Sequence, residues 1–308
     1  IDENYPEVKS FGKLSRLGIL KKYKIINMNF SEQFIYNYLL MARRNIDQAV
    51  GTDKNTQIKF NEKIAGKLKS GLSLHYLNQY LEHNIVENSI KEFVRKNKNK
   101  ITNNKDFKNI LEANSNQNLD WFFNELIYSR NKIDYKITNA KKANDSIEVT
   151  IKNLGDTQVP VSIYGYNNNK LVSKNWVENN AKTFKFYVKN DSITKFVLND
   201  NYEIPEINNN NNSYKLKNRF LGNRKIRFTF FKDIENAKYN QVFYVPTAEF
   251  NLYDGLLLGI KFNNKSIIDK PFTYDVKCLF YDIKSNKLFI GTGEKGIGII
   301  TLNKFGIL

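Results

Sequence analysis

Apolar side chains recur at steps of three and four residues through the first part of the chain, from Asn29 to Arg130. This spacing places them on one face of a helix, so it predicts helices rather than strands. The expected helical segments are Phe34–Ile46, Ile64–Tyr80, Ile85–Val94 and Asp106–Ile127. Together they predict a helical bundle or the wall of one.

The apolar residues move to every second position after Tyr128, which predicts a domain boundary near residue 130. Expected strands lie at 133–137, 147–151, 159–164, 183–188 and 195–198. Because Asn, Asp and Gly turns separate them, they predict a small antiparallel β-sandwich that ends near Pro205. The consecutive asparagines Asn208–Asn212 then predict a polar linker with nothing to bury.

Further alternating segments follow the asparagines, at 226–231, 241–245, 255–262, 272–280, 288–290 and 297–302. Two structures fit this pattern. Strands with one apolar face and aromatic ends are what an outer-membrane barrel needs. A soluble sheet that packs one face on the sandwich gives the same alternation.

The expected fold is therefore a multidomain α+β protein. Its parts are a helical domain at 1–130, a β-sandwich at 131–206, an Asn-rich linker at 207–216 and a β-rich segment at 217–308. The last segment is either a sheet or the start of an outer-membrane barrel. With 308 residues and 41% hydrophobic residues, the chain can bury a core in each domain.

The formal net charge of +17 comes from lysines scattered along the whole length. Such a surface attracts nucleic acid, anionic lipid or acidic polysaccharide over long range. No nucleic-acid-binding motif accompanies the charge, so specific nucleic-acid binding is not expected. No stretch of 18 or more apolar residues occurs, and we expect no helix that spans a membrane.

Short motifs in the chain give no catalytic centre. Gly291–Gly296 matches the spacing of a dinucleotide-binding loop, but that loop needs a helix after it, and Ile297–Ile300 has a strand pattern. We interpret the glycines as a hairpin turn. His75 and His83 are the only histidines, and they lie eight residues apart on one expected helix. A separation of about 12 Å is too long for a shared metal.

Residues Gly66–Leu81 resemble a helix of the aminopeptidase N family of zinc peptidases, the gluzincins. The resemblance extends back through Arg43–Gln48 and forward to Asn118–Glu125, which looks like the helix that closes the family's catalytic domain. In that family a β-sandwich follows this helix. The resemblance implies zinc-dependent peptide hydrolysis for a full-length member. It also implies that all three zinc ligands precede residue 1, so we expect no zinc in this chain.

Lys67 is the candidate site residue that the resemblance singles out. The family has a tyrosine at this position, which donates a hydrogen bond to the oxyanion of the transition state. The ammonium group of Lys67 is a poorer preorganised donor than a held phenol. Loss of such a donor typically costs about 100- to 1000-fold in turnover. The substitution predicts a degenerate or inactive relative, a pseudoenzyme.

The expected function is that of a fragment of a zinc metallo-aminopeptidase-like protein, inactive as this chain. The alternative is a non-enzymatic envelope protein that uses the peptidase-like cleft to bind peptides. Either function predicts peptides or protein N-termini as partners. The β-rich C-terminal segment is similar to extensions of such peptidases in Bacteroidetes-type envelopes. That similarity implies a place in the periplasm or at the outer membrane. A basic nucleic-acid or polysaccharide binder is a third reading, which leaves the order of helices and sandwich unexplained.

Overall fold

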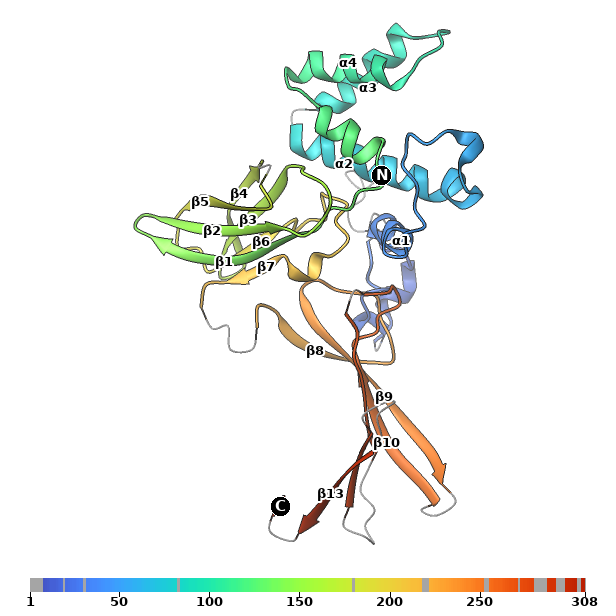
Figure 1. Ribbon diagram of the computed structural model, residues 1–308, viewed down its shortest axis with the longest axis vertical. Helices are drawn as coiled ribbons and strands as arrows, with labels where there is room; N and C mark the ends of the chain where they lie inside the picture. Colours follow the sequence, from blue (N-terminus) through green and yellow to red (C-terminus); the bar gives the residue numbers. More distant parts are fainter. Residues whose placement is uncertain are drawn as a thin grey trace. The chain divides into compact units, whose positions relative to one another are not determined.

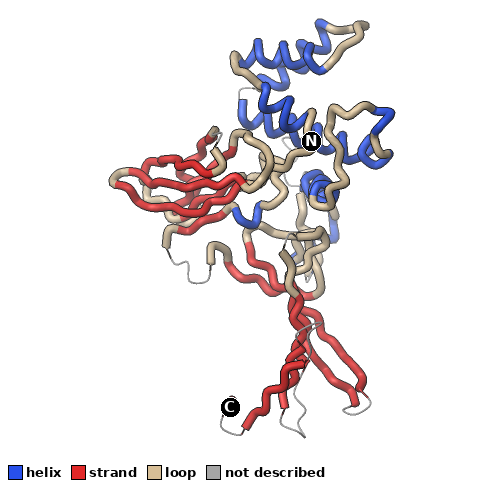
Figure 2. Tube along the Cα trace, in the orientation of Figure 1, coloured by secondary structure: helices blue, strands red, loops and turns tan. Residues whose placement is uncertain are grey.

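The computed structural model describes residues 8–18, 20–29, 32–81, 84–178, 181–217, 222–251, 255–270, 272–279, 287–291, 297–303 and 306–307. The chain divides into two compact units (Figures 1 and 2). One unit comprises Ser31–Asn223, and the other combines Ile1–Phe30 with Arg224–Leu308. The predicted boundary at residue 130 falls inside the first of these units.

Helices fill the first part of the unit 31–223, as the three- and four-residue spacing predicts. They are α1 (Glu32–Ala42), α2 (Gly66–Leu81), α3 (Ile85–Lys96) and α4 (Asn104–Ser115), with a short 3-10 turn η3 (Lys54–Thr56) and π-helical turns η4 (Asn61–Ala65) and η5 (Phe122–Ile127). A capping box of Asn103 and Asp106 begins α4.

The segment predicted as one helix at 106–127 is two elements. Asn116 ends α4 in the left-handed conformation, with a φ of 53°, and its N–H bonds back to the carbonyl of Glu112. Asparagine tolerates this conformation better than most residues, so it terminates the helix. The chain re-enters helical geometry at Asp120 and continues into η5.

The sandwich consists of two antiparallel sheets. One sheet has the order β1 (Tyr135–Ala143), β2 (Ser146–Asn153), β5 (Thr183–Lys189), and the other has the order β4 (Lys170–Val177), β3 (Val161–Asn167), β6 (Lys195–Leu198), β7 (Ser213–Lys215). These strands confirm the segments predicted from alternation. They add β4 and β7, which the sequence analysis did not identify.

The asparagine run is part of the sandwich, and the prediction of a linker with nothing to bury is wrong. Asn209 and Asn212 are buried, the 3-10 turn η6 spans Asn209–Asn211, and β7 follows directly. The amide group of Asn212 donates to the carboxyl oxygen Oε2 of Glu206 at 2.6 Å. The sandwich supplies partners for the amide nitrogen of Asn212 and the amide oxygen of Asn209, whereas the other polar atom of each amide is buried without one.

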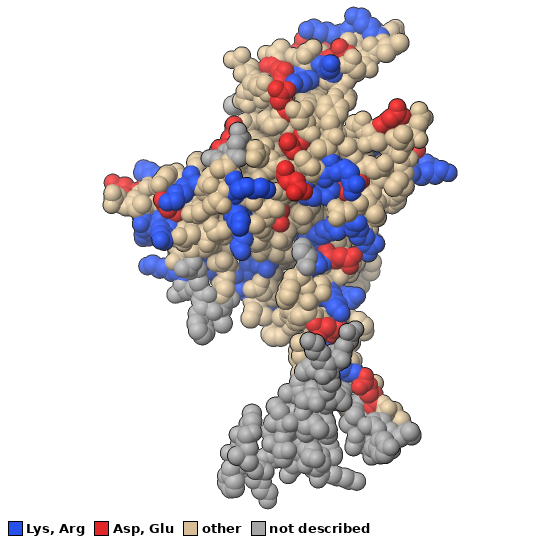
Figure 3. Space-filling model, in the orientation of Figure 1, with Lys and Arg blue, Asp and Glu red and all other residues tan. Residues whose placement is uncertain are grey.

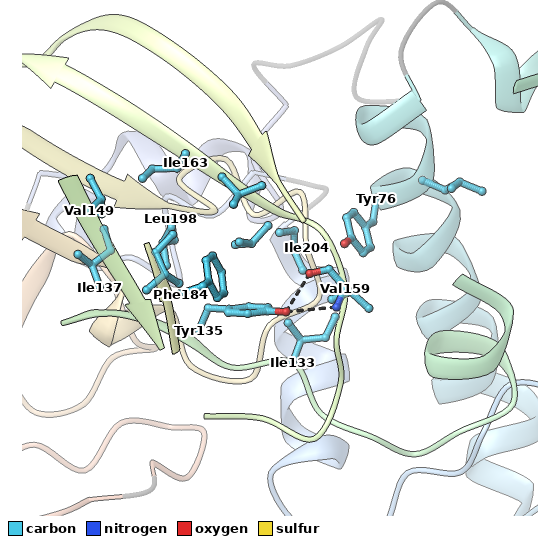
Figure 4. Packing of buried hydrophobic residues seen from close by; sticks show 14 of the residues in the cluster. Tyr76, Ile133, Tyr135, Ile137, Val149, Val159, Ile163, Phe184, Leu198 and Ile204 are labelled. Atoms are coloured by element: carbon cyan, nitrogen blue, oxygen red, sulfur yellow. Dashed lines mark hydrogen bonds between the residues drawn. The ribbon is translucent and has the colours of Figure 1, made fainter. Parts of the chain in front are cut away.

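A single hydrophobic core joins the helices to the sandwich. It runs from Tyr76 and Leu77 of α2 through Phe122 of η5 to the inner faces of both sheets. Figure 4 shows Tyr76 facing this core beside the loop that carries Val159. The phenol of Tyr135 donates to the carbonyl of Val159 at 2.8 Å and accepts from its N–H at 3.2 Å. Helices and sandwich therefore form one packed body.

The other unit is built around a seven-stranded sheet in the order β14-β13-β12-β11-β10-β9-β8. The strands are β8 (Lys225–Phe230), β9 (Tyr239–Asn251), β10 (Gly255–Asn263), β11 (Asp275–Leu279), β12 (Lys287–Gly291), β13 (Ile297–Asn303) and β14 (Gly306–Ile307). Strands β8 to β13 confirm the six predicted segments. The pair β8–β9 is parallel, and the other neighbouring pairs are antiparallel.

Residues near the N-terminus belong to this unit through backbone hydrogen bonds. They contain the 3-10 turns η1 (Gly12–Arg16) and η2 (Leu20–Lys22). The buried carboxylate of Asp233 accepts from the N–H groups of Lys24 at 2.6 Å and Ile25 at 2.9 Å. These charge-assisted bonds fix the N-terminal segment to the loop after β8.

The fold class is α+β, with helices and antiparallel sheets in separate segments. Within the described residues, no helix has the length and apolar character that a membrane crossing requires.

Candidate functional site

Helix α2 carries the residue that the sequence analysis singled out. Lys67 lies in the first turn of α2, and its side chain is exposed. It makes no hydrogen bond or ion pair with any residue that the structure describes. Its assignment to the transition-state position of the peptidases stays a prediction.

The start of α2 has a tight backbone approach. The N–H of Gly66 bonds to the carbonyl of Asn61, which closes the π turn η4. A Cβ atom at Gly66 would lie 2.8 Å from that carbonyl oxygen. Only glycine fits there without a backbone shift, so the turn fixes where the helix begins and how Lys67 is presented.

Lys69, two positions further along, is buried. Only 2% of the residue is exposed, and its ammonium group donates to the backbone carbonyl of Ser129 at 3.1 Å. Burial lowers the pKa of Lys69 to about 8, because a charged group loses its hydration there. Asp47 opposes this shift, whereas Lys132 and Arg130 reinforce it.

Asp47 and Lys132 form a buried ion pair beside Lys69. The ammonium group of Lys132 lies 2.6 and 2.5 Å from the two carboxylate oxygens of Asp47. Burial, and then the charge of Asp47, raise the pKa of the Tyr38 phenol in α1. Arg130 donates from its guanidinium to the carbonyl of Asn45 at 2.6 Å. We call Asp47, Lys69 and Lys132 the buried ion cluster; Arg130 is exposed.

The buried ion cluster joins segments that are far apart in the sequence. Asp47 follows α1, Lys69 belongs to α2, and Lys132 leads into the sandwich. Removal of one partner of a buried ion pair leaves the other charge uncompensated, which is strongly destabilising. The pair therefore fixes the positions of these segments relative to one another. Since Lys69 has a pKa near 8, it is the described lysine best placed to change protonation near neutral pH.

Aromatic rings form the contact between α2 and the sandwich. Tyr76 and Tyr80 of α2 both contact Trp121 and Trp176, with ring centroids 5.4 to 5.8 Å apart. The phenol of Tyr76 donates to the carbonyl of Pro160, and that of Tyr80 to the carboxylate of Glu178. This packed contact leaves α2 little freedom to move relative to β4.

A second buried carboxyl group lies in the sandwich. Glu206 accepts from the N–H of Tyr135 at 2.5 Å and from the amides of Asn212 and Asn199 at 2.6 and 3.3 Å. Burial raises the pKa of Glu206 to about 8, although these hydrogen bonds oppose the shift. These three partners in the described chain all belong to the sandwich, so Glu206 is arranged as a structural group.

The two histidines are the first candidates for metal binding. His75 is exposed on α2, and His83 lies outside the described residues. In the part of the chain that the structure describes, no three His, Cys, Asp or Glu side chains are grouped to hold a metal ion. The expectation of no zinc in this chain stays a prediction.

The surface charge is dispersed. Lys and Arg side chains are spread over the visible face, with Asp and Glu side chains among them (Figure 3). The expectation of no specific nucleic-acid binding stays a prediction.

Among known proteins, the chain has distant structural similarity to solved structures. No protein-family model and no curated protein matches the chain. The crystal structure of Legionella pneumophila aminopeptidase A in complex with aspartic acid matches with a TM-score of 0.44 and 13% sequence identity. The match covers 52% of this chain and 19% of that chain, so the chain spans about a fifth of the structure it resembles. A likeness of this degree supports no statement about activity.

The sequence analysis singled out Lys67, whose role stays a prediction, and did not find the buried ion cluster. Lys69, Ser73, Tyr76 and Leu77 all lie on the buried face of α2, at helical spacing. A lysine in phase with an apolar stripe is a signal that could have identified Lys69. The ion pair of Asp47 and Lys132 depends on tertiary contact and has no such local signal.

Proposed function

We propose that residues 32–217 are the helical and sandwich part of a protein related to the zinc aminopeptidases, and that this chain acts as a scaffold without hydrolysing peptides. The observation that supports the proposal is the single core shared by α2, η5 and the sandwich. The resemblance implies this order of elements, and the motif that carries it, Gly66–Leu81, coincides with α2.

Lys67 supports the absence of hydrolysis. Its ammonium group is exposed, on a flexible side chain that no described residue holds. A group that stabilises an oxyanion has to be preorganised, because reorganisation during the reaction costs much of its benefit. Zinc enters the proposal only as the metal of the related enzymes, and no step is assigned to it here.

Zinc content and aminoacyl anilide cleavage test the proposal on the full chain. After incubation with zinc and dialysis, we expect substoichiometric metal and a rate of cleavage equal to that of buffer. The variant Lys67→Tyr, which restores the family's phenol, should be equally inactive because a donor alone does not activate water. Stoichiometric zinc together with cleavage that a chelator abolishes would overturn the proposal.

The alternative function is peptide binding without hydrolysis, with peptides or protein N-termini as partners. An exposed and unpaired ammonium group at Lys67 favours it, since this group is free to pair with a peptide carboxylate or carbonyl. Titration of the same protein preparation with short peptides tests this alternative. If short peptides bind saturably, and Lys67→Ala weakens this binding whereas Lys63→Ala does not, the peptide-binding function is supported. If binding does not saturate, that function is excluded.

A place in the cell envelope belongs to the same proposal, with the β-rich segment as the part that associates with the outer membrane. The observation that supports it is the exposed apolar face of the sheet formed by residues 224–308. Phe228, Phe250 and Leu258, which lie on that face through the β8–β9 and β9–β10 pairing, are 63%, 75% and 57% exposed. Exposed apolar area of this kind marks a surface for lipid or protein.

Flotation with lipid vesicles tests the association. We expect the chain to rise with the vesicles, and Phe228→Asn together with Phe250→Asn to reduce the floated fraction by at least about half, since each substitution removes apolar area. Phe60→Asn, which alters an exposed phenylalanine of the other unit, is the control. A chain that stays at the bottom of the gradient contradicts the association.

A further inference from the structure

A cavity of about 620 Å³ opens within the unit that contains the seven-stranded sheet. It is lined by Phe231, Lys232, Val245, Lys261, Asn263, Lys265 and Asp275. Small-molecule sites usually occupy about 300 to 1,000 Å³, so this cavity has the right size for one. It lies outside the buried ion cluster and is independent of the proposed peptidase relationship.

The register of the sheet explains why these side chains converge. Val245 of β9 pairs with Lys261 of β10, and Asn263 of β10 pairs with Asp275 of β11. Partners in register share a face of the sheet, as do residues two apart on one strand. All four therefore lie on the same face. Lys265 enters from the loop after β10.

Phe231 closes the cavity from the end of β8. Its φ of 61° turns the chain out of the strand direction, while its N–H still bonds to the carbonyl of Tyr244 at 3.0 Å. The ring of Phe231 packs against that of Phe230, with centroids 4.7 Å apart. Phe231 and Val245 provide the apolar part of the lining.

The charges that line the cavity do not balance. Three lysines face one carboxylate, which leaves two positive charges in excess. Asp275 accepts from Lys261 at 3.0 Å and from Lys265 at 2.7 Å, and Lys232 has no ion pair with a described residue. Like charges held close together attract an anion that can neutralise them.

Asn263 adds a directed donor to this cationic wall. The residue is only 5% exposed, and its amide oxygen accepts from the N–H of Lys265 at 3.0 Å. That bond fixes the amide plane. The amide nitrogen donates to no residue in the described ranges, although the side chain belongs to the cavity wall. This N–H group is therefore free to donate to a ligand oxygen in the cavity.

We propose that this cavity binds a small molecule with a dianionic head, a phosphate monoester or a pair of carboxylates, carried on an apolar body. The head neutralises Lys232, Lys261 and Lys265 and accepts from Asn263. The body lies against Phe231 and Val245. Lysine binds phosphate and carboxylate as a point charge, so the site selects for charge and size rather than for bidentate geometry.

Calorimetric titration of the full chain with chosen probes tests the proposal. Phenyl phosphate carries the dianionic head and the apolar body above pH 7. Phthalate tests paired carboxylates, benzoate a single charge, phenol the body alone and inorganic phosphate the head alone. We expect phenyl phosphate or phthalate to bind about tenfold tighter than benzoate and inorganic phosphate, with affinity falling as salt increases. The tighter of the two identifies the head group.

Variants separate the site from the general charge of the protein. Lys261→Gln should weaken binding of the dianion about tenfold, and Asp275→Asn should tighten it, because it removes the carboxylate that competes for the lysines. Phe231→Ala should weaken phenyl phosphate but leave inorganic phosphate unchanged. Lys238→Gln removes the same charge from an exposed lysine outside the cavity and should change affinity less than twofold.

Specific results would overturn the proposal. One is the absence of saturation by any dianionic probe at 10 mM, which is about ten thousandfold above the Kd of a micromolar site. The others are equal losses of affinity in Lys238→Gln and Lys261→Gln, and binding of phenol as tight as that of phenyl phosphate. If Lys261→Gln fails to fold by circular dichroism, Asp275→Asn and Phe231→Ala still decide the question.

Discussion

Lys69 holds an ammonium group where only 2% of the residue meets solvent. Among the described residues it donates only to the carbonyl of Ser129, and the nearby carboxylate of Asp47 is already paired with Lys132. The pKa of Lys69 consequently falls from 10.5 to about 8. At neutral pH the folded protein bears a cost for keeping this group charged, which is about 3 kcal/mol for a shift of this size.

This cost predicts a pH dependence of stability that belongs to Lys69. Between pH 8 and 10.5 the unfolded chain keeps the proton that the folded chain has released, so the free energy of unfolding rises with pH in that window. Lys69→Met removes the titration. The free energy of unfolding of the wild type relative to Lys69→Met should therefore increase by about 3 kcal/mol from pH 7 to pH 10.5.

Denaturant titration at several pH values measures this difference. Lys67→Met is the matched control, because it removes an exposed lysine from the same turn and should change the pH profile little. A wild type and a Lys69→Met variant with parallel profiles would show that Lys69 stays protonated across the window and would contradict the lowered pKa.

The candidate site could be predicted only in part at the level of residues. The motif around α2 singles out Lys67 as a candidate, and a motif carries no information about burial. Two positions along a helix turn a side chain by about 200°, so Lys67 faces solvent while Lys69 faces the core. Asp47 and Lys132 are 85 residues apart, and only the folded chain brings them together.

At the scale of elements, alternation predicted strands wherever one sheet face is buried. Strand β4 was missed because it lies at the edge of its sheet, where most of its residues are exposed or half-buried and the alternation is weak. The asparagine run was misread for the opposite reason. Polarity normally marks exposure, but Glu206 accepts from the amides of Asn199 and Asn212 inside the sandwich.

Single asparagines set the ends of two helices, and hydrophobic periodicity does not take such residues into account. The first segment was expected to reach Ile46, yet α1 ends at Ala42 and Asn45 follows with a φ of 56°. Asn116 ends α4 in the same way. Apolar spacing continues past both positions, so only the left-handed preference of asparagine marks the stop.

At the scale of the whole molecule, the helices and the sandwich share one core, whereas the sequence predicts separate domains on either side of residue 130. The change of period marks a change of secondary structure, and it does not show whether the two parts pack together. Trp121 and Trp176 lie on either side of residue 130, and both contact Tyr76, with ring centroids 5.4 and 5.8 Å away.

The shared core predicts that helices and sandwich unfold in one transition. Both tryptophans of the chain belong to the unit 31–223, so tryptophan fluorescence reports on this unit. In Trp121→Phe the remaining Trp176 reports on the sandwich, and in Trp176→Phe the remaining Trp121 reports on the helical part. In each variant the fluorescence midpoint in denaturant should coincide with the loss of helical circular dichroism, as expected when a packed body unfolds cooperatively.

Both substitutions remove similar aromatic contacts, so each variant serves as the control for the other. If Trp176 kept its native fluorescence after the helical signal was lost, the sandwich would be an independent domain, and the boundary near residue 130 would hold.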